Sequence, residues 1–403
     1  MPVFPYVGVI GMQWVRGKGH LLLVAANVAV ALLALVGCSS SSSGQASEPA
    51  IGEAPTATTP TTSMSPATST TTTTTTAATT STVSTTTLVP LVGWTGPVEH
   101  LFFHTLVIRP ELAFTADSTG KGFLDYFVTV GEFKAILEQL YANGWTLVDV
   151  HQAVAGHVEV PVGRKPLVLS EDDVNYYAYE GGRGLGARLV LDGAGNVKIE
   201  ERDERGTRIT DNDLIPLLDQ FVASHPLFSV NGAKAVLALT GYEGLFGERT
   251  NKLTDPAWAD SAARARGVAD RLKATGWILA SHSYGHIDFK KDSEPIALRD
   301  TDRWIAEVSP IIGPTDIFVY PFGAAPATGS ATVQMLRGKG FTILCDIDTV
   351  ARLKPADGVV VMSRRHIDGI AFANQTKTLA PFFDVGTVQD TTARRITTPA
   401  TTR

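Results

Sequence analysis

The chain has 403 residues, of which 44% are apolar, and its 34 basic and 40 acidic side chains give a net charge of −6. This length and composition suffice to bury at least one large core. The acidic excess, with no basic block, argues against nucleic acid as the primary partner. Two cysteines, Cys38 and Cys345, exclude a disulfide-rich scaffold.

An uncharged, mostly apolar run spans residues 21–36, just after Arg16 and Lys18. Its length suits the core of a signal peptide and is short for a membrane-spanning helix. The run ends in Leu35-Val36-Gly37-Cys38 and five serines, which resembles a bacterial lipobox with Cys38 as the lipidated residue. We therefore expect residues 1–37 to be a lipoprotein signal peptide, with an uncleaved anchor helix as the alternative. Either reading predicts an exported chain, tethered to the cell membrane and facing the cell wall or periplasm.

The segment that follows is dominated by hydroxyl side chains. Residues 39–90 contain 19 threonines and 11 serines, with almost nothing large and apolar. Such a segment cannot bury enough surface to offset the entropy lost on ordering it. We expect a disordered linker over residues 38–96, and the similar composition of residues 390–403 predicts a disordered tail. Residues 97–389 remain for a folded catalytic domain.

Short apolar runs alternate with amphipathic segments through this domain, which is the rhythm of β/α units. A first strand is expected over residues 101–108. Thr129 and Glu132 have the spacing of a capping box before a helix that ends at Asn143-Gly144. Further strands are expected at 145–150, 165–170, 233–240, 277–281, 316–320, 341–345 and 359–362. Helices are expected from Leu214 to Val222, from Asp255 to Gly276, from Pro295 to Ile312 and from Ala331 to Gly340. Seven or eight strands with helices between them predict an α/β fold, a distorted (β/α) barrel of about seven parallel strands.

Two strand ends in this barrel carry residues that packing does not explain. Ser170-Glu171-Asp172-Asp173 follows the apolar run Leu167-Val168-Leu169. Adjacent carboxylates at a barrel mouth repel one another, so they need a cation or a shared proton. The alternative is a solvated acidic turn, which would have the same sequence pattern. After the strand at 277–280 comes Ser281-His282-Ser283-Tyr284-Gly285-His286. Two imidazoles four residues apart, joined by one carboxylate, can form a three-ligand metal site with open positions.

These two motifs, in this order, resemble those of the polysaccharide deacetylases of carbohydrate esterase family 4. The matching residues are Asp172-Asp173 and His282-Ser283-Tyr284-Gly285-His286, and the likeness extends to Phe103-His104 and to Tyr320-Pro321-Phe322-Gly323. It covers most of residues 98–370. The resemblance implies a divalent metal, usually zinc, held by Asp173, His282 and His286. It also implies removal of N- or O-acetyl groups from sugars.

The resemblance further implies a role for each motif residue. Asp172 would be the general base and His366 the general acid, with a surface or supporting role as the alternative for His366. A backbone N–H near Phe322 would stabilise the oxyanion. The substrate groove would be lined by Tyr320, Pro321, Phe322, Gly323 and His104. For His104, the alternative is a buried histidine with a backbone hydrogen-bond partner.

Two departures from the family pattern concern the base. Glu171 replaces the usual phenylalanine, and an extra carboxylate beside Asp172 is expected to raise the pKa of the base. Val319 stands where the family has an arginine that positions the base. Arg364 and Arg365 are candidates to reach across the barrel and take over that task.

Residues 174–211 form a long insertion after the acidic turn. Residues 188–191 and 197–199 flank Asp192-Gly193-Ala194-Gly195-Asn196, which predicts a β-hairpin standing over the site. Tyr176, Tyr177 and Tyr179 open the insertion and are candidates to stack on sugar rings, and packing of these tyrosines onto the barrel is the alternative.

The leading hypothesis is thus a membrane-tethered, metal-dependent deacetylase of cell-wall or extracellular polysaccharide. The alternatives are hydrolysis of another amide or ester, and a catalytically weak lipoprotein that binds glycan. The sequence leaves the oligomeric state open.

Overall fold

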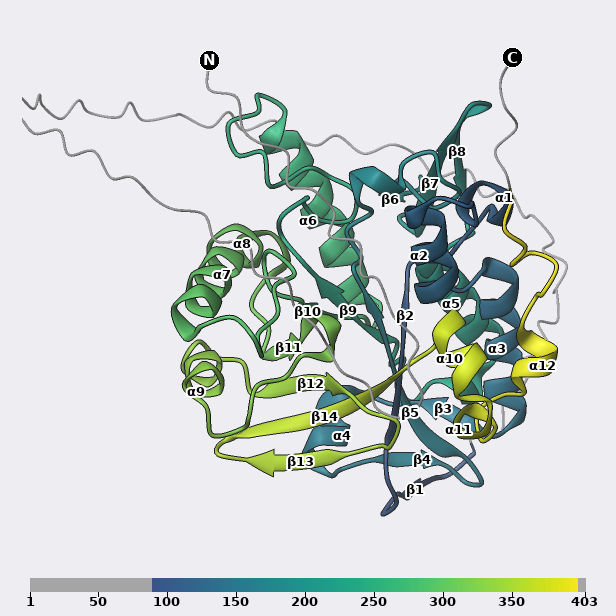
Figure 1. Ribbon diagram of the computed structural model, residues 1–403. Coiled ribbons are helices and arrows are strands. Elements are labelled where there is room, and N and C mark those ends of the chain that lie inside the picture. The colour runs from purple at the N-terminus through teal and green to yellow at the C-terminus, as the bar shows by residue number, and fades with distance from the viewer. Residues whose placement is uncertain (1–88, 398–403) are drawn as a thin grey trace, which may run out of the picture. The chain divides into compact units, whose positions relative to one another are not determined.

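The computed structural model of the protein describes residues 89–397, and its centre is a closed barrel of seven parallel strands (Figure 1). Neighbouring strands pair in the order β12, β11, β10, β9, β5, β2 and β14, and β12 also pairs with β14, which closes the ring. The strands are β2 (Glu99–His104), β5 (Lys165–Asp172), β9 (Ala235–Leu239), β10 (Ile278–Ser281), β11 (Ile317–Val319), β12 (Ile343–Ile347) and β14 (Val359–His366). The (β/α) barrel expected from the sequence is confirmed.

Side chains along each barrel strand alternate between the interior and the layer under the helices. Val168, Ala238, Ala280, Val319 and Cys345 belong to one buried cluster, which fills the interior with small and branched side chains. A larger cluster packs the outer face of the strands against the helices, and it includes Leu101, Leu169, Leu237, Phe318 and Leu344. Two successive residues of one strand therefore meet different environments.

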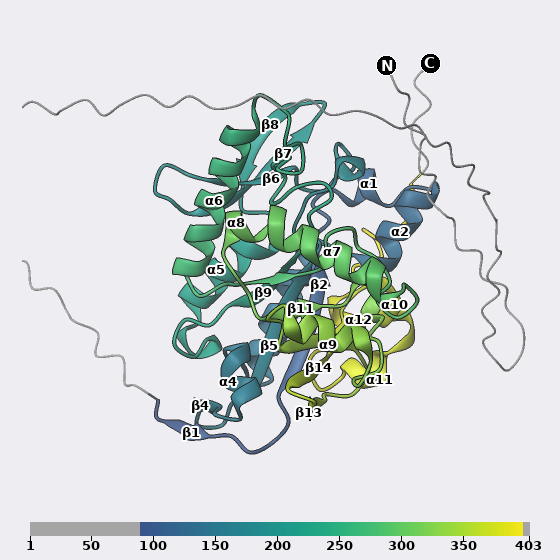
Figure 2. The same ribbon diagram turned by 90° about the vertical axis from the view of Figure 1, so that its left-hand side faces the viewer.

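Helices cover the outside of the barrel (Figures 1 and 2). The longer ones are α2 (Ser118–Tyr126), α3 (Val130–Ala142), α5 (Leu214–Ser224), α6 (Trp258–Ala274), α7 (Glu294–Glu307) and α9 (Ala331–Gly338). The capping box expected at Thr129 and Glu132 starts α3, with both of its hydrogen bonds in place. The helix expected from Pro295 to Ile312 is broken after Glu307, because Pro310 supplies no N–H and α8 (Ser309–Ile312) starts anew.

Short elements complete the domain. The remaining helices are α1 (Pro110–Ala113), α4 (Val150–Ala155), α10 (Gly369–Asn374), α11 (Thr376–Leu379) and α12 (Val385–Val388). Single 3-10 turns lie at η1 (Ala178–Glu180), η2 (Pro226–Phe228) and η3 (Pro321–Gly323). Strand β3 (Trp145–Leu147) pairs with β5, and β13 (Leu353–Ala356) runs antiparallel to β14.

The insertion is a three-stranded antiparallel sheet of β6 (Arg188–Leu191), β7 (Val197–Asp203) and β8 (Gly206–Thr210). The hairpin of β6 and β7 was expected, but the polar third strand was not. Leu189, Val197 and Ile199 are buried in the outer core, and the sheet contacts α5 and α6. The hairpin is thus anchored to the helix layer, which corrects the expectation that it stands over the site.

Both ends of the folded domain extend further than the composition suggested. Strand β1 (Leu91–Gly93) pairs with β4 (Glu159–Pro161), so the expected linker 38–96 ends before Leu91. At the other end, the guanidinium of Arg394 donates to both carboxylate oxygens of Glu132, at 2.6 and 2.8 Å. Residues 390–397 are therefore part of the domain, contrary to the expected disordered tail. Composition missed this because the buried Arg394–Glu132 pair and long-range hydrogen bonds, such as that from the N–H of Thr397 to the carbonyl of Phe114, fix the segment.

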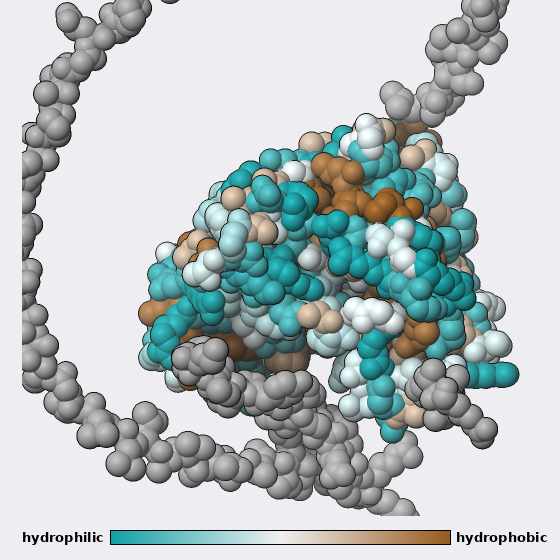
Figure 3. All heavy atoms as spheres, turned by 90° about the horizontal axis from the view of Figure 1, so that it is seen from above, coloured by the Kyte–Doolittle hydropathy of each residue, from teal (hydrophilic) through white to brown (hydrophobic). Residues whose placement is uncertain are grey.

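Hydrophilic residues cover most of the face seen in Figure 3, and hydrophobic ones gather in a few patches. Within residues 89–397, no helix combines the length and the apolar character needed to cross a membrane. The expected signal peptide, the lipidation at Cys38 and most of the linker lie outside the described residues.

The Glu132–Arg394 pair predicts a large loss of stability when one partner is removed. Glu132 is 0% and Arg394 8% exposed, so Arg394→Met leaves a buried carboxylate without its cation. We expect the free energy of unfolding to fall by about 3–5 kcal/mol, measured by urea unfolding followed by tryptophan fluorescence. Arg395→Met is the matched control, because Arg395 is exposed, and its effect should stay within about 0.5 kcal/mol. Equal stabilities of the two variants would contradict this account of the tail.

Candidate metal centre

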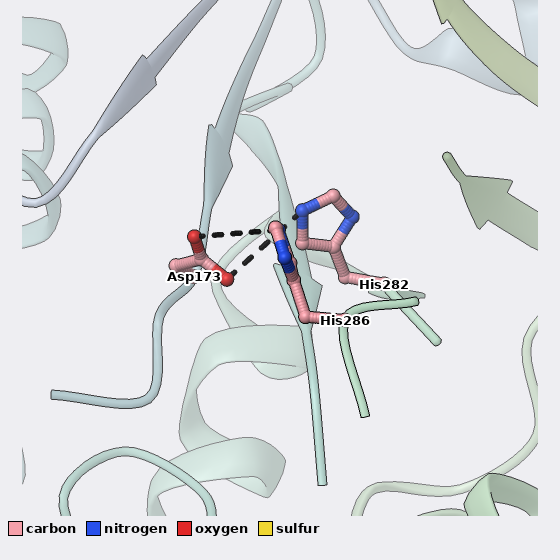
Figure 4. A group of neighbouring side chains, drawn as sticks. All are labelled: Asp173, His282 and His286. Atoms are coloured by element: carbon pink, nitrogen blue, oxygen red, sulfur yellow. Dashed lines mark ion pairs between the residues drawn. The ribbon is translucent and has the colours of Figure 1, made fainter. Parts of the chain in front are cut away.

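Three side chains converge at the carboxyl ends of two barrel strands (Figure 4). Asp173 follows β5, and His282 and His286 lie in the loop after β10. The Nε2 atom of His282 lies 4.0 Å from one carboxylate oxygen of Asp173, and Nε2 of His286 lies 3.9 Å from the other. One ligand atom from each residue can be chosen so that all three lie within 4.8 Å of one another. The structure thus brings together the ligand set expected from the sequence.

The loop that carries the two histidines is fixed by two contacts. The Nδ1 atom of His282 lies 2.8 Å from the carbonyl oxygen of Val319. A carbonyl only accepts, so Nδ1 donates to it and Nε2 is the nitrogen left to act as a ligand beside Asp173. The carboxylate of Asp300 accepts from the backbone N–H groups of Tyr284 and Gly285, both at 2.7 Å. These bonds hold both imidazoles in place.

The protonation states of the cluster suit a cation. Burial lowers the pKa of His286 to about 4, so this ring is neutral at pH 7. Burial alone would raise the pKa of Asp173, but the facing imidazoles of His286 and His282 and the hydroxyl of Tyr177 lower it overall. An ionised carboxylate with neutral imidazole nitrogens is a donor set that divalent ions such as zinc favour. The residues present therefore fit the divalent metal that the motifs implied.

Asp172 is held beside this cluster by a buried arginine. Arg364 on β14 donates from Nη1 and Nη2 to the two carboxylate oxygens of Asp172, at 2.7 and 3.0 Å. Burial alone would raise the pKa of Asp172, but Arg364 outweighs it and holds the pKa well below the usual range. Arg365, the other candidate, pairs with Glu99 instead. Of the two candidates, Arg364 is thus the one that contacts Asp172.

Glu171 does not act on the base as expected. It is 0% exposed and alternates with Asp172 along β5, so it faces the outer layer near Asp213 and Tyr176. Burial, then Asp213 and Asp172, raise the pKa of Glu171 well above its usual value. The raised pKa is thus that of Glu171 itself, and the pKa of Asp172 is lowered and not raised.

His104 and the candidate acid His366 both lie near the ring of Phe102. The His104 ring centroid is 5.8 Å from that of Phe102, and the His366 centroid is 6.3 Å away. Nδ1 of His104 lies 3.1 Å from the carbonyl oxygen of Tyr126. In His366, Nδ1 lies 2.7 Å from a carboxylate oxygen of Asp368, and Nε2 lies 2.6 Å from the side-chain amide nitrogen of Gln375. Both ring nitrogens of His366 thus have protein partners.

The candidate substrate-binding residues separate into exposed and buried ones. Phe322 is 66% exposed, has a positive φ of 59°, and its ring lies 4.4 Å from that of His286. Tyr320 is 1% exposed and packs against Phe318, and Pro321 is also buried. Gly323 has φ 63°, and a Cβ there would meet Ile347 at 2.6 Å. Only Phe322 of this motif presents a side chain to solvent, so Tyr320 and Pro321 shape the turn and do not line a groove.

Tyr176 is also a structural residue. It is 1% exposed, and its hydroxyl donates to a carboxylate oxygen of Asp213 at 2.9 Å in the outer core. The expectation that Tyr176 stacks on sugars is wrong, because the turn after Asp173 directs this side chain into the core.

Sequence reasoning missed several residues that support the site. The hydroxyl of Ser170 accepts from Arg364 at 3.2 Å and lies 3.0 Å from Nε2 of His100. Tyr177 donates its hydroxyl to Asp173 at 2.6 Å and also contacts the hydroxyl of Thr240 at 2.9 Å. Strand alternation would have found Ser170 and His100, since each shares the interior face with Asp172 or His104. Tyr177 belongs to the run of tyrosines that opens the insertion, but nothing in the local sequence signals its hydrogen bond to Asp173.

No protein-family model and no curated protein matches the chain. The chain does match solved structures at low identity. Streptococcus pyogenes deacetylase PplD in complex with acetate is 13% identical over 68% of this chain and 93% of that chain, with a TM-score of 0.41. BC0361, a polysaccharide deacetylase from Bacillus cereus, is 15% identical over 72% and 69%, with a TM-score of 0.41. IcaB from Ammonifex degensii is 14% identical over 71% and 97%, with a TM-score of 0.39. Likenesses with TM-scores below 0.5 are too loose to decide what this chain does.

The ligand geometry predicts one bound divalent ion per chain. We expect the purified protein to carry it after incubation with zinc and removal of excess metal, and His282→Ala to lose it because two ligands hold zinc weakly. Inductively coupled plasma mass spectrometry measures the metal content. His151→Ala is the matched control, since His151 also lies between two carboxylates, Asp149 and Asp316, but outside the cluster. If the His282→Ala protein retained the ion, the assignment of Asp173, His282 and His286 as its ligands would be wrong.

Proposed function

We propose that the protein is a metal-dependent deacetylase that hydrolyses N- or O-acetyl groups of a cell-wall or extracellular polysaccharide. The observation that carries this proposal is the pairing of Asp172 with Arg364, directly beside the ligands Asp173, His282 and His286. A site that only bound metal or glycan would have no use for an ionised base held in this way. The order and chemistry of the motifs, which resemble those of polysaccharide deacetylases, support the same assignment.

The residues divide the work of hydrolysis among them. Asp173, His282 and His286 would hold a divalent ion, most simply zinc, which would lower the pKa of a water and polarise the acetyl carbonyl. Asp172 takes the proton as the water oxygen adds to the carbonyl carbon. Arg364 fixes the orientation of that carboxylate and keeps it ionised. The backbone N–H of Phe322 is the candidate donor to the oxyanion.

The leaving nitrogen or oxygen needs a proton, and we assign its donor to His104 and not to His366. Nδ1–H of His104 donates to the carbonyl of Tyr126, so the proton given to the leaving group would be a second one, carried on Nε2 of the imidazolium form. His104 also interacts electrostatically with both Asp172 and Asp173. His366 is engaged by Asp368 and Gln375 and supports Phe102. The C–N or C–O bond then breaks to give acetate and the free amine or alcohol.

The base is tested by acetate release from N-acetylated chitooligosaccharides and O-acetylated xylooligosaccharides. Asp172→Asn removes the proton acceptor, so we expect the rate to fall by about 10²–10⁴-fold while the metal content stays unchanged. Glu171→Gln is the matched control, because Glu171 is the adjacent carboxyl but faces the other layer, and it should keep most of the activity. Undiminished turnover by the Asp172→Asn protein would refute the mechanism. In the same assay, His104→Gln should lose more activity than His366→Gln, and the reverse order would return the acid role to His366.

We also propose that the enzyme is a lipoprotein anchored to the cell membrane through Cys38. The support is the sequence alone: the apolar run at 21–36, the lipobox-like end and the hydroxyl-rich segment that follows. Expressed in a bacterium, the full chain is expected to enter the membrane fraction and to incorporate labelled palmitate, whereas Cys38→Ser should incorporate none. Ser39→Ala controls for a change next to the cysteine. Palmitate labelling that survives Cys38→Ser would exclude this anchor.

A further inference from the structure

Three tyrosine rings lie face to face beside the metal centre. The ring of Tyr177 lies 5.6 Å from that of Tyr179 with an interplanar angle of 16°, and 5.1 Å from that of Tyr242 with an angle of 21°. Tyr177 and Tyr179 belong to the start of the insertion, and Tyr242 belongs to the loop after β9. We call these three residues the tyrosine column. Its members come from two segments far apart in the sequence.

The tyrosine column is buried at its middle ring and exposed to solvent at its two outer rings. Tyr177 is only 4% exposed, whereas Tyr179 is 52% and Tyr242 36% exposed. The hydroxyl of Tyr177 donates to the metal ligand Asp173 at 2.6 Å. The middle ring thus anchors the column to the metal centre. Tyr179 also stacks on Phe123, with ring centroids 6.4 Å apart, so Tyr242 is the outer ring that presents aromatic surface beside the site.

The two loops that carry the column are fixed to each other. The backbone N–H of Ala178 donates to the carboxylate of Glu243 at 2.6 Å. Arg249 donates to the carbonyl oxygens of Glu243 and Tyr176, at 2.8 and 2.9 Å. Asn175 donates to the carbonyl oxygen of Thr240 at 2.9 Å. Aromatic side chains on such a frame lose little conformational entropy when a ligand binds, which favours a binding surface.

We propose that Tyr242 forms a subsite for a pyranose ring that neighbours the acetylated sugar in the glycan chain. The proposal rests on the proposed function in that the ligand is an acetylated glycan. A pyranose ring has an apolar C–H face and a rim of hydroxyl groups, and an exposed tyrosine has an aromatic face and a hydroxyl to match them. Tyr177 stacks on Tyr242 and is hydrogen-bonded to the metal ligand Asp173, so Tyr242 lies near the metal centre. A sugar stacked on Tyr242 can therefore belong to the same glycan chain as the sugar whose acetyl group reacts.

The subsite makes binding depend on chain length. A monosaccharide fills only the position at the metal centre, whereas an oligosaccharide reaches the tyrosine column as well. Removing the ring of Tyr242 therefore weakens the binding of a pentasaccharide and leaves that of a monosaccharide unchanged. If Tyr242 had only a structural role, its removal would leave the binding of both ligands unchanged or weaken the binding of both equally.

The test measures binding by calorimetry to zinc-loaded Asp172→Asn protein, in which turnover is suppressed. The probes are N-acetylchitopentaose, O-acetylated xylopentaose and N-acetylglucosamine. Adding Tyr242→Ala is expected to raise the Kd for at least one pentasaccharide about tenfold, which corresponds to about 1.4 kcal/mol, with no change for N-acetylglucosamine. Tyr242→Phe should bind like the parent, because it keeps the ring. Val162→Ala is the control, since Val162 is 55% exposed beside β4, away from the metal centre.

The Tyr177→Phe variant distinguishes the ring stacking of the column from its hydrogen bond to the metal ligand. It keeps the stacked ring and removes the hydrogen bond to Asp173, so it should bind pentasaccharide normally while its zinc affinity falls about tenfold. Pentasaccharide binding that Tyr242→Ala leaves unchanged, or no binding of either pentasaccharide to the parent, overturns the subsite. Failure of the proposed function looks different, because a chain that binds pentasaccharide through Tyr242 but releases no acetate retains the subsite and loses the reaction.

Discussion

The buried ion pair between Asp172 and Arg364 is the interaction on which the centre of the barrel depends. Asp172 is 3% and Arg364 0% exposed, and taking both charges out of water is costly unless each finds its partner in good geometry. Two parallel hydrogen bonds supply that geometry, and Ser170 and the Phe102 ring, 4.2 Å from the guanidinium carbon, complete the surroundings of Arg364. Strands β5 and β14 lie on either side of β2, so the pair depends on the curvature that brings their inward-facing side chains together.

The alternation of side chains along β5 gives two neighbouring acids opposite properties. Asp172 meets Arg364 in the interior and stays ionised, whereas Glu171 meets Asp213 under the helices and is driven toward its neutral form. A one-residue shift in register would exchange the two environments and place an unpaired charge in the core. The position of the base is thus set by strand register as much as by residue type.

The residues that follow β5, β10 and β11 at the metal centre have strained backbone conformations. Asp173, Ser283, His286 and Phe322 all have positive φ values, between 53° and 61°. Non-glycine residues adopt this region at a cost of about 1–3 kcal/mol each, and such residues cluster at functional sites. The hydrogen bonds that Asp300 accepts and the contact of His282 with Val319 offset part of that cost. The ligands are therefore placed by turns that the rest of the domain holds in shape.

The sequence by itself determined the barrel, the capping box of α3 and the ligand set Asp173, His282 and His286. The barrel and the cap have local signals, apolar periodicity and a four-residue motif. Histidine spacing at a strand end indicated a metal site, and the resemblance to the deacetylase motifs implied Asp173 as its carboxylate. Only the tertiary structure decided between Arg364 and Arg365, turned Glu171 away from the base, buried Tyr176 and joined Arg394 to Glu132. Each of these depends on a partner more than thirty residues away or on the face of a strand in the closed barrel. The tyrosine column is of the same kind, since nothing in the local sequence brings Tyr242 to Tyr177.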